Sequence, residues 1–249
     1  AIICSGGKAV AGSSSSPPTT HGSGDLPGEG SSSAATVWAV LRKECRCEWR
    51  TRHGVGAALL FAVTTLAGVS FAVGRLTDRV DLLAALLWVV LLFASLASLA
   101  HSFVREVEAG TLTLLRLVAS PTEIGLGKLL FHLLFLGLLE LVTVPLFLVR
   151  TGSPPVRWGP FLLVLGLGSL ALAATTTLVG ALVAQTRARG ALFAAVSLPL
   201  LMAVLAAGAS GLRGQWEGVS VAGEARLLAA YAAVVLGASL LLYDHVWED

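Results

Sequence analysis

Long apolar runs separated by short polar segments are the main pattern along the chain. Each run is close to the roughly 20 residues that a helix needs to cross a hydrocarbon core about 30 Å thick. Lipid offers no partner for a backbone N–H or C=O group, so each run is expected to be helical. The alternation typical of a membrane β-barrel strand is absent. The six predicted spans are residues 54–73, 82–100, 129–149, 161–184, 191–209 and 227–243.

Two segments precede the first span. Residues 1–34 are rich in Ser, Gly and Pro, and we predict a disordered tail because they cannot bury enough apolar surface to offset the entropy of ordering. Residues 35–52 predict an amphipathic helix too charged to cross a membrane, with Trp38 and Trp49 on one side and basic residues around most of the remainder. This composition favours an elbow helix lying at the headgroup boundary. The alternative is an amphipathic helix packed on a partner.

Composition excludes an ordinary soluble domain. Hydrophobic residues make up 55% of the chain and charged residues 13%, against about 25% charged residues in typical soluble domains. The net charge of +2 is too small to indicate nucleic-acid binding. Cys4, Cys45 and Cys47 fit neither a disulfide framework nor a common zinc spacing, so we interpret them as free thiols and expect no metal site.

The basic residues between the runs predict an orientation. With the N-terminus in the cytoplasm, ten Lys and Arg residues between 42 and 189 fall inside, and six fall outside. The positive-inside rule then favours a multi-pass protein with both termini in the cytoplasm.

The longest inside segment, residues 101–128, is expected to form short helices along the membrane surface. Gly110 permits a break, Thr111 caps a short apolar helix, and Ser120 with Pro121 begins another turn that Glu123 helps to cap. An amphipathic element there suits docking into a groove on a cytoplasmic partner. The predicted coupling residues are Arg105, Glu106, Glu108, Gly110, Leu112, Leu115 and Pro121.

Two ionisable residues lie within the third run. Glu140 is near its middle, where a charge is costly, so it is expected to face the bundle interior or to be protonated. It either couples helix movement along a polar path or hydrogen-bonds a neighbouring helix, for instance at Thr175–Thr177. His132 lies eight residues earlier on the same face, and one histidine is weak evidence for a heme ligand.

Catalytic motifs are missing from the sequence. Gly127-Lys128 lacks the remainder of a phosphate-binding loop, so ATP energy is expected from a separate chain. The spans contain no paired carboxylates, no His-Glu metal motif and no Ser-His pair, which argues against an intramembrane enzyme. A passive scaffold remains a rival interpretation.

The segment SFVREVEAGTLTLLRLVASPTEIGLGK resembles the CcmB family, the permease subunits of the cytochrome c maturation ABC exporter. Glu140 and Pro145 in the third run, and the ending that closes on YDHVWED, are also similar to that family. The resemblance covers roughly residues 36–249. The wider class of ABC-2-type exporters shares part of the loop motif, so a permease for a drug, lipid or polysaccharide is the alternative.

The resemblance implies a six-span ABC-2-type permease in a bacterial inner membrane that is not itself an enzyme. It implies a CcmA-like ATP-binding subunit, CcmC-like and CcmD-like membrane proteins, and two permease copies or a permease heteromer. No cofactor is expected on the chain itself. ATP would act through the partner, and heme would be a transported or handled ligand.

Overall fold

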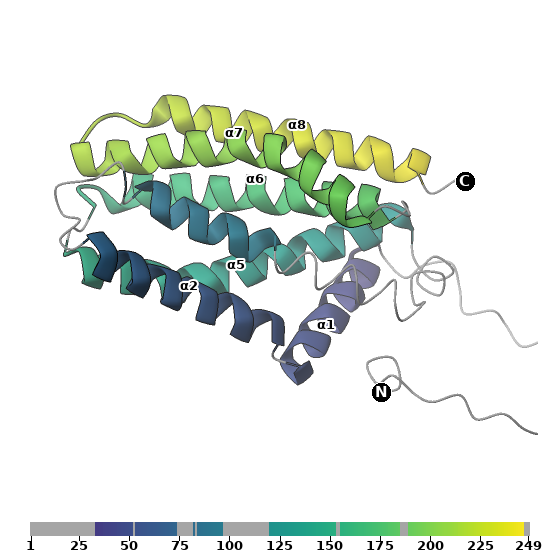
Figure 1. Cartoon of the computed structure of the whole chain (residues 1–249). Coiled ribbons are helices and arrows are strands. Elements are labelled where there is room, and N and C mark those ends of the chain that lie inside the picture. The colour runs from purple at the N-terminus through teal and green to yellow at the C-terminus, as the bar shows by residue number, and fades with distance from the viewer. Residues whose placement is uncertain are drawn as a thin grey trace, which may run out of the picture.

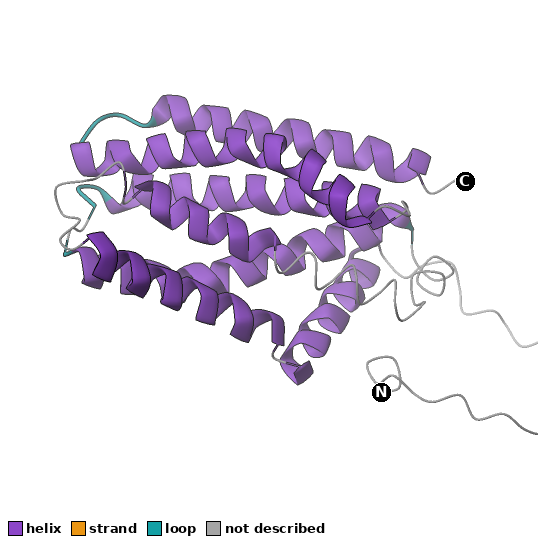
Figure 2. Cartoon of the chain, viewed as in Figure 1, coloured by secondary structure: helices purple, strands orange, loops and turns teal. Residues whose placement is uncertain are grey.

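The computed structural model describes residues 33–51, 53–73, 82, 84–96, 120–152, 155–184 and 189–246. Helices account for nearly all of these residues, and no strand occurs among them (Figure 2). The helices are α1 (Ser33–Thr51), α2 (His53–Val73), a helix over Ala84–Leu96, α5 (Pro121–Thr151), α6 (Trp158–Ala184), α7 (Arg189–Glu217) and α8 (Ala222–Val246). The prediction of an all-α membrane protein is confirmed.

Helices α5 to α8 form an antiparallel bundle, and α2 lies alongside α5 (Figure 1). Helix α1 is inclined across one end of this bundle. The beginning of α5 and the end of α8 lie at that same end. The turn over residues 218–221 joins α7 to α8 at the opposite end of the bundle (Figure 1). The tail over residues 1–32 lies outside the described residues.

Helix α6 is the central helix of the bundle. Within its apolar window 67% is buried, compared with 39% for α5 and 22% for α8. Its inner positions carry small or branched residues such as Val164, Ala173 and Val179, each with no exposed surface. Small side chains let neighbouring helices approach closely, and that contact drives helix association where the lipid is as apolar as the protein.

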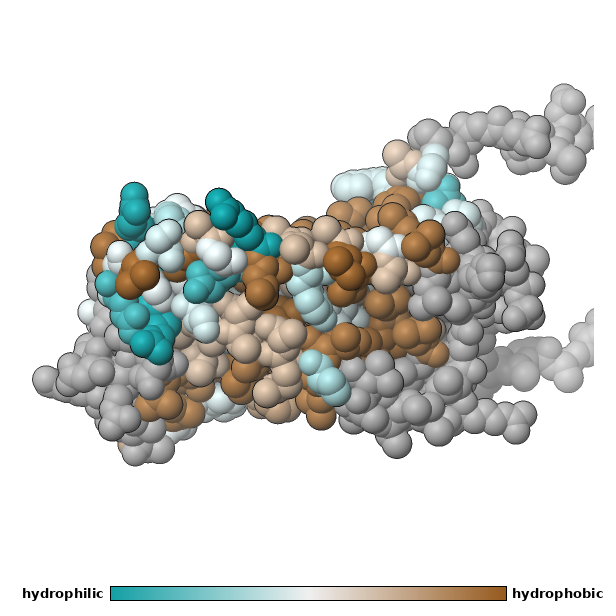
Figure 3. All heavy atoms as spheres, turned by 90° about the horizontal axis from the view of Figure 1, so that it is seen from above, coloured by the Kyte–Doolittle hydropathy of each residue, from teal (hydrophilic) through white to brown (hydrophobic). Residues whose placement is uncertain are grey.

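The outer surface of the bundle is largely hydrophobic. Leu134 and Leu141 of α5 and Val234 of α8 are among the large apolar side chains left exposed. On the face formed by α7 and α8, hydrophobic side chains cover the middle, and hydrophilic ones gather near the turn between these helices (Figure 3). Such a surface is stable in a bilayer rather than in water.

Three helical segments are long and apolar enough to cross a membrane by themselves: Thr122–Val149, Trp158–Leu182 and Ala222–Leu241. They contain most of the predicted third, fourth and sixth spans. Helix α2, Ala84–Leu96 and α7 overlap the first, second and fifth. The count of six spans therefore stays a prediction, although a multi-pass membrane protein is clear.

Helix α5 corrects one boundary. Residues 121–128 were expected to belong to a surface loop, yet they form the first two turns of the spanning helix. The Ser120 hydroxyl accepts from the Glu123 N–H at 3.3 Å, and the Glu123 carboxylate accepts from the Ser120 N–H at 3.0 Å. This reciprocal cap, with Pro121 at the start, sets the beginning of the helix.

Helix α7 corrects a second boundary, because it continues past the expected end at residue 209 to Glu217. Gln215 is 2% exposed, and its backbone carbonyl accepts from the Val156 N–H at 3.3 Å. Arg213 and Glu217, one turn apart, form an ion pair of 2.7 Å. These contacts support two further helical turns that lie beyond the apolar run.

Trp88 packs the Ala84–Leu96 helix against α6 and α7. Trp88 has no exposed surface, and its ring lies against the backbone of Gly168 on α6 and of Gly208 on α7. A Cβ atom at Gly168 would be 1.8 Å from the Trp88 ring, and one at Gly208 would be 2.4 Å away. Helix α6 and the Ala84–Leu96 helix therefore pack closely at Gly168. At Gly166 the space beside the helix is open.

Candidate functional site

Helix α5 carries three ionisable residues on one face. Lys128, His132 and Glu140 are spaced by four and eight residues, so they follow one another along the same side of the helix. This side faces α1 at its beginning and α6 further along. The placement of His132 and Glu140 on one inward face was predicted. The part taken by Lys128 was not.

At the end nearest α1, Lys128 forms a buried ion pair. Its Nζ lies 3.6 Å from Oε1 of Glu44, and the two residues are 3% and 7% exposed. Lys43 lies 3.4 Å from the same oxygen. Two charges at such depth are stable only when they neutralise each other, because desolvating either one alone is expensive. The pair therefore ties α1 to α5.

The backbones of α1 and α5 also approach closely beside this pair. A Cβ atom at Gly127 would lie 2.6 Å from Val40 Cγ1 and 3.3 Å from the Val37 carbonyl oxygen. Val40, Glu44 and Cys47 are the buried positions of α1, whereas Trp38 and Trp49 are 65% and 78% exposed. The tryptophan side of α1 therefore faces outward, and a separate stripe makes the contact with α5.

His132 is enclosed between α5 and α6. It has no exposed surface, and its Nδ1 lies 3.2 Å from the hydroxyl oxygen of Thr177. Thr177 also donates to the Ala173 carbonyl at 2.7 Å, so the hydroxyl accepts from Nδ1. The Nε2 atom has no hydrogen-bond partner among the described residues. His132 does not line either of the larger described cavities.

Glu140 is paired with a different residue from the one expected. Its carboxylate accepts a hydrogen bond from the hydroxyl of Ser169 on α6. The predicted neighbour, the Thr175–Thr177 run, lies on the correct helix but bonds elsewhere. The interior position of Glu140 is thus observed. Whether its charge has a role in transport stays a prediction.

The three consecutive threonines of α6 contact three different helices. Thr175 donates to the Tyr231 hydroxyl of α8 at 3.3 Å, and Tyr231 donates to the Leu200 carbonyl of α7 at 3.0 Å. Thr176 accepts from Ser95 at 3.5 Å, and Thr177 bonds His132. One turn of α6 therefore forms hydrogen bonds with α5, α8 and the Ala84–Leu96 helix.

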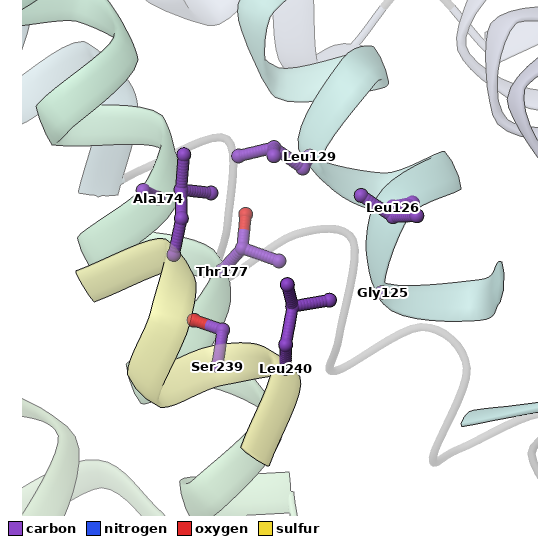
Figure 4. Close-up of a pocket in the computed structure, with 8 residues that line it drawn as sticks. Gly125, Leu126, Leu129, Ala174, Thr177, Ser239 and Leu240 are labelled. Atoms are coloured by element: carbon purple, nitrogen blue, oxygen red, sulfur yellow. The ribbon is translucent and has the colours of Figure 1, made fainter. Parts of the chain in front are cut away.

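A cavity of about 180 Å³ lies between α5, α6 and α8 near this turn (Figure 4). Leu129, Thr177, Ser239 and Leu240 surround it, and Ser239 donates to the Val235 carbonyl of its own helix. The cavity is apolar and small. No charged residue lines this cavity, and neither Glu140 nor His132 is among its lining residues.

Of the predicted coupling residues, only Pro121 belongs to the part of the chain that the structure describes. Arg105, Glu106, Glu108, Gly110, Leu112 and Leu115 lie outside the described residues. Pro121 is the first residue of α5, and the predicted cap at Glu123 is confirmed. From Pro121 the helix leads within two turns to Lys128, so the predicted coupling segment adjoins the ion pair to α1.

Metal ligands do not cluster in the described part of the chain, where no group of three His, Cys, Asp or Glu side chains is placed to hold an ion. Cys45 is a free thiol. Cys47 is disulfide-bonded, which corrects the expectation that it is a free thiol.

The fold and the buried polar contacts between its helices define a multi-pass, all-α membrane protein. The CcmB protein family model matches residues 35–242, and the chain belongs to this family. It is 31% identical over 201 residues to heme exporter protein B of Pseudomonas aeruginosa, covering 79% of this chain and 89% of that protein. It is 30% identical over 202 residues to heme exporter protein B of Rhodobacter capsulatus, covering 80% and 92%. For Bradyrhizobium diazoefficiens, the protein of the same name is 34% identical over 172 residues, covering 67% and 76%.

Proposed function

We propose that the chain is the membrane-spanning permease subunit of an ABC exporter that acts in heme export for cytochrome c maturation. The observation that carries this proposal is family membership across residues 35–242. Relatives named heme exporter protein B match along most of their own length. The other ABC-2-type substrates considered above have no comparable support.

In this proposal the chain does no catalysis. ATP is hydrolysed by a separate CcmA-like subunit, and CcmC-like and CcmD-like proteins complete the assembly in a bacterial inner membrane. The permease has six spans and is present in two copies or as a heteromer. Its α1 is the elbow helix, and the end of the bundle that carries α1 faces the cytoplasm. The basic residues of α1 favour this orientation.

Deleting the gene in its own host tests the function directly. We expect the loss of covalently bound heme from c-type cytochromes, restored by the intact chain and measured by heme staining of separated membrane proteins. Normal cytochromes in the deletion strain, with export of another compound lost instead, would contradict the proposal.

The same assay tests the charge of Glu140. Glu140→Gln keeps an oxygen that accepts from Ser169, so the variant is expected to insert and remain folded. We expect c-type cytochromes to fall to a small fraction of the unmodified level, because the amide cannot ionise. Ser169→Ala is the matched control, since it removes the hydrogen bond and keeps the carboxyl group. Normal maturation with Glu140→Gln would reject a role for ionisation.

Force from ATP hydrolysis must enter through a cytoplasmic surface, and residues 101–128 form the longest predicted inside segment. We expect Leu112→Ala with Leu115→Ala to weaken association with the ATP-binding subunit, since truncating central apolar anchors often costs about 2 kcal/mol each. Glu108→Lys should act similarly, and more strongly at low salt. Co-purification of the ATP-binding subunit at equal membrane abundance is the measurement. Undiminished co-purification with normal function would place the coupling surface elsewhere.

A further inference from the structure

A groove of about 380 Å³ opens between α1, α2 and α5. Trp49 of α1, Gly56 of α2 and the apolar side chains of α5 from Phe131 to Leu138 form its walls. Leu134 and Leu138 are 60% and 44% exposed, so the groove opens on the lipid-facing side of α5. Its size lies in the range of small-ligand pockets, and its walls suit hydrocarbon.

The outward charge of α1 beside this groove is positive. Arg42, Arg46 and Arg50 are exposed. Of the two acidic residues of the helix, Glu44 pairs with Lys128. Glu48 lines the groove, where its carboxylate accepts from the Val55 N–H at 2.7 Å. Helix α1 therefore presents arginines to the surroundings, while each of its two carboxylates is bound by a partner on another helix.

Helical spacing places two of these arginines by the groove. Arg42 precedes Cys45 by three residues, and Arg46 precedes Trp49 by three, while Cys45 and Trp49 both line the groove. Trp49 is 78% exposed, as suits an indole at the headgroup level of a bilayer. Guanidinium groups bind phosphate oxygens in a bidentate manner.

We propose that this groove binds an anionic phospholipid, with one acyl chain between α1, α2 and α5 and the headgroup phosphate held by Arg42 and Arg46. An acyl chain that leaves the bilayer for the groove gains little, because both surroundings are apolar. The selectivity therefore comes from the headgroup and its charge. A second copy of the chain suits this face less well, because it would bring the arginines of two α1 helices together.

The headgroup preference is testable with the full chain in nanodiscs made from equal amounts of phosphatidylglycerol and phosphatidylcholine. Native mass spectrometry after mild extraction is expected to show retained lipid enriched in phosphatidylglycerol. Arg42→Gln and Arg46→Gln should each reduce the enrichment about fivefold. Arg157→Gln with Arg226→Gln, at the other end of the bundle, is the control and should leave it unchanged. Equal retention of both lipids by the unmodified chain overturns the proposal.

A second variant blocks the groove itself. Space beside Gly56 is open, with no atom within 4 Å of the position that a Cβ would take, so Gly56→Leu fills the groove without disturbing the helix. We expect loss of retained lipid of either headgroup. Gly68→Leu is the matched control, because Gly68 lies on the same helix, is exposed and also has open space. Retained lipid in Gly56→Leu equal to that in Gly68→Leu overturns the proposal. The proposal is also overturned if the unmodified chain is a dimer that Gly56→Leu dissociates and Gly68→Leu does not, because a second copy of the chain would then occupy the groove.

Discussion

Replacing Gly168 with alanine is expected to destabilise the bundle by about 3 kcal/mol or more, the upper range for overpacked cores. The added Cβ would stand 1.8 Å from Cη2 of Trp88. The indole has little room to move, because its ring also lies against Gly208, where a Cβ would be 2.4 Å away. The clash must therefore move α6 or expel the Ala84–Leu96 helix. The loss of stability is measured by heating the purified chain to a series of temperatures and determining by size-exclusion chromatography how much folded protein is left after each.

Gly166 provides a control on the same helix. It is exposed with open space beside it, so Gly166→Ala should be neutral or stabilising by up to about 1 kcal/mol, because alanine favours the helix. Adding Trp88→Leu to Gly168→Ala should restore part of the lost stability by making room. If Gly168→Ala melts at the same temperature as Gly166→Ala, the Trp88 ring does not pack against Gly168 as tightly as we infer.

The bounds of a span could be predicted where the apolar run and the helix begin and end at nearly the same residues. The run at 161–184 and α6 differ by three residues at the start and none at the end. Prediction failed where a polar residue is buried by a distant partner. Lys128 directly precedes the apolar run at 129–149, yet Glu44 of α1 neutralises it within the bundle. Nothing in the local pattern connects these two residues.

The sequence was enough to predict that Glu140 and His132 lie inside the bundle, but not which residues they bond. Charge within an apolar run suffices to place Glu140 and His132 inside the bundle, because lipid exposure would be costly. Which hydroxyl each one meets depends on the axial register of α5 against α6. Ser169 and Thr177 are eight residues apart on α6, matching the eight residues between Glu140 and His132, in antiparallel order. That register emerges only once the helices are packed.

The ion pair at the beginning of α5 connects the predicted coupling segment to α1. Pro121 begins α5, and two turns later Lys128 contacts Glu44. Close backbone contact at Gly127 leaves little room for α1 and α5 to slide past each other. We therefore expect the end of the predicted loop, the start of α5 and α1 to move together. Any force applied at the loop would then reach the elbow helix.

Lys128→Met is expected to release α1 from α5. The substitution leaves the Glu44 carboxylate buried with Lys43 as its remaining basic neighbour, and breaking a buried pair typically costs about 3–5 kcal/mol. Cys45, the neighbouring free thiol, is partly buried in the folded chain and reports this change. We expect maleimide labelling of Cys45 to be faster by an order of magnitude or more, with the spanning helices still inserted.

Two further variants separate the ion pair from general damage. Glu44→Met combined with Lys128→Met removes both charges, so labelling should return toward the unmodified rate. Arg213→Met breaks an exposed pair at the opposite end, whose side chains are 55% and 39% exposed, and such pairs contribute about 0–1 kcal/mol. Labelling should then be unchanged. If Lys128→Met labels no faster than Arg213→Met, α1 is held by apolar packing at Gly127 and Val40, and the ion pair does not determine its docking.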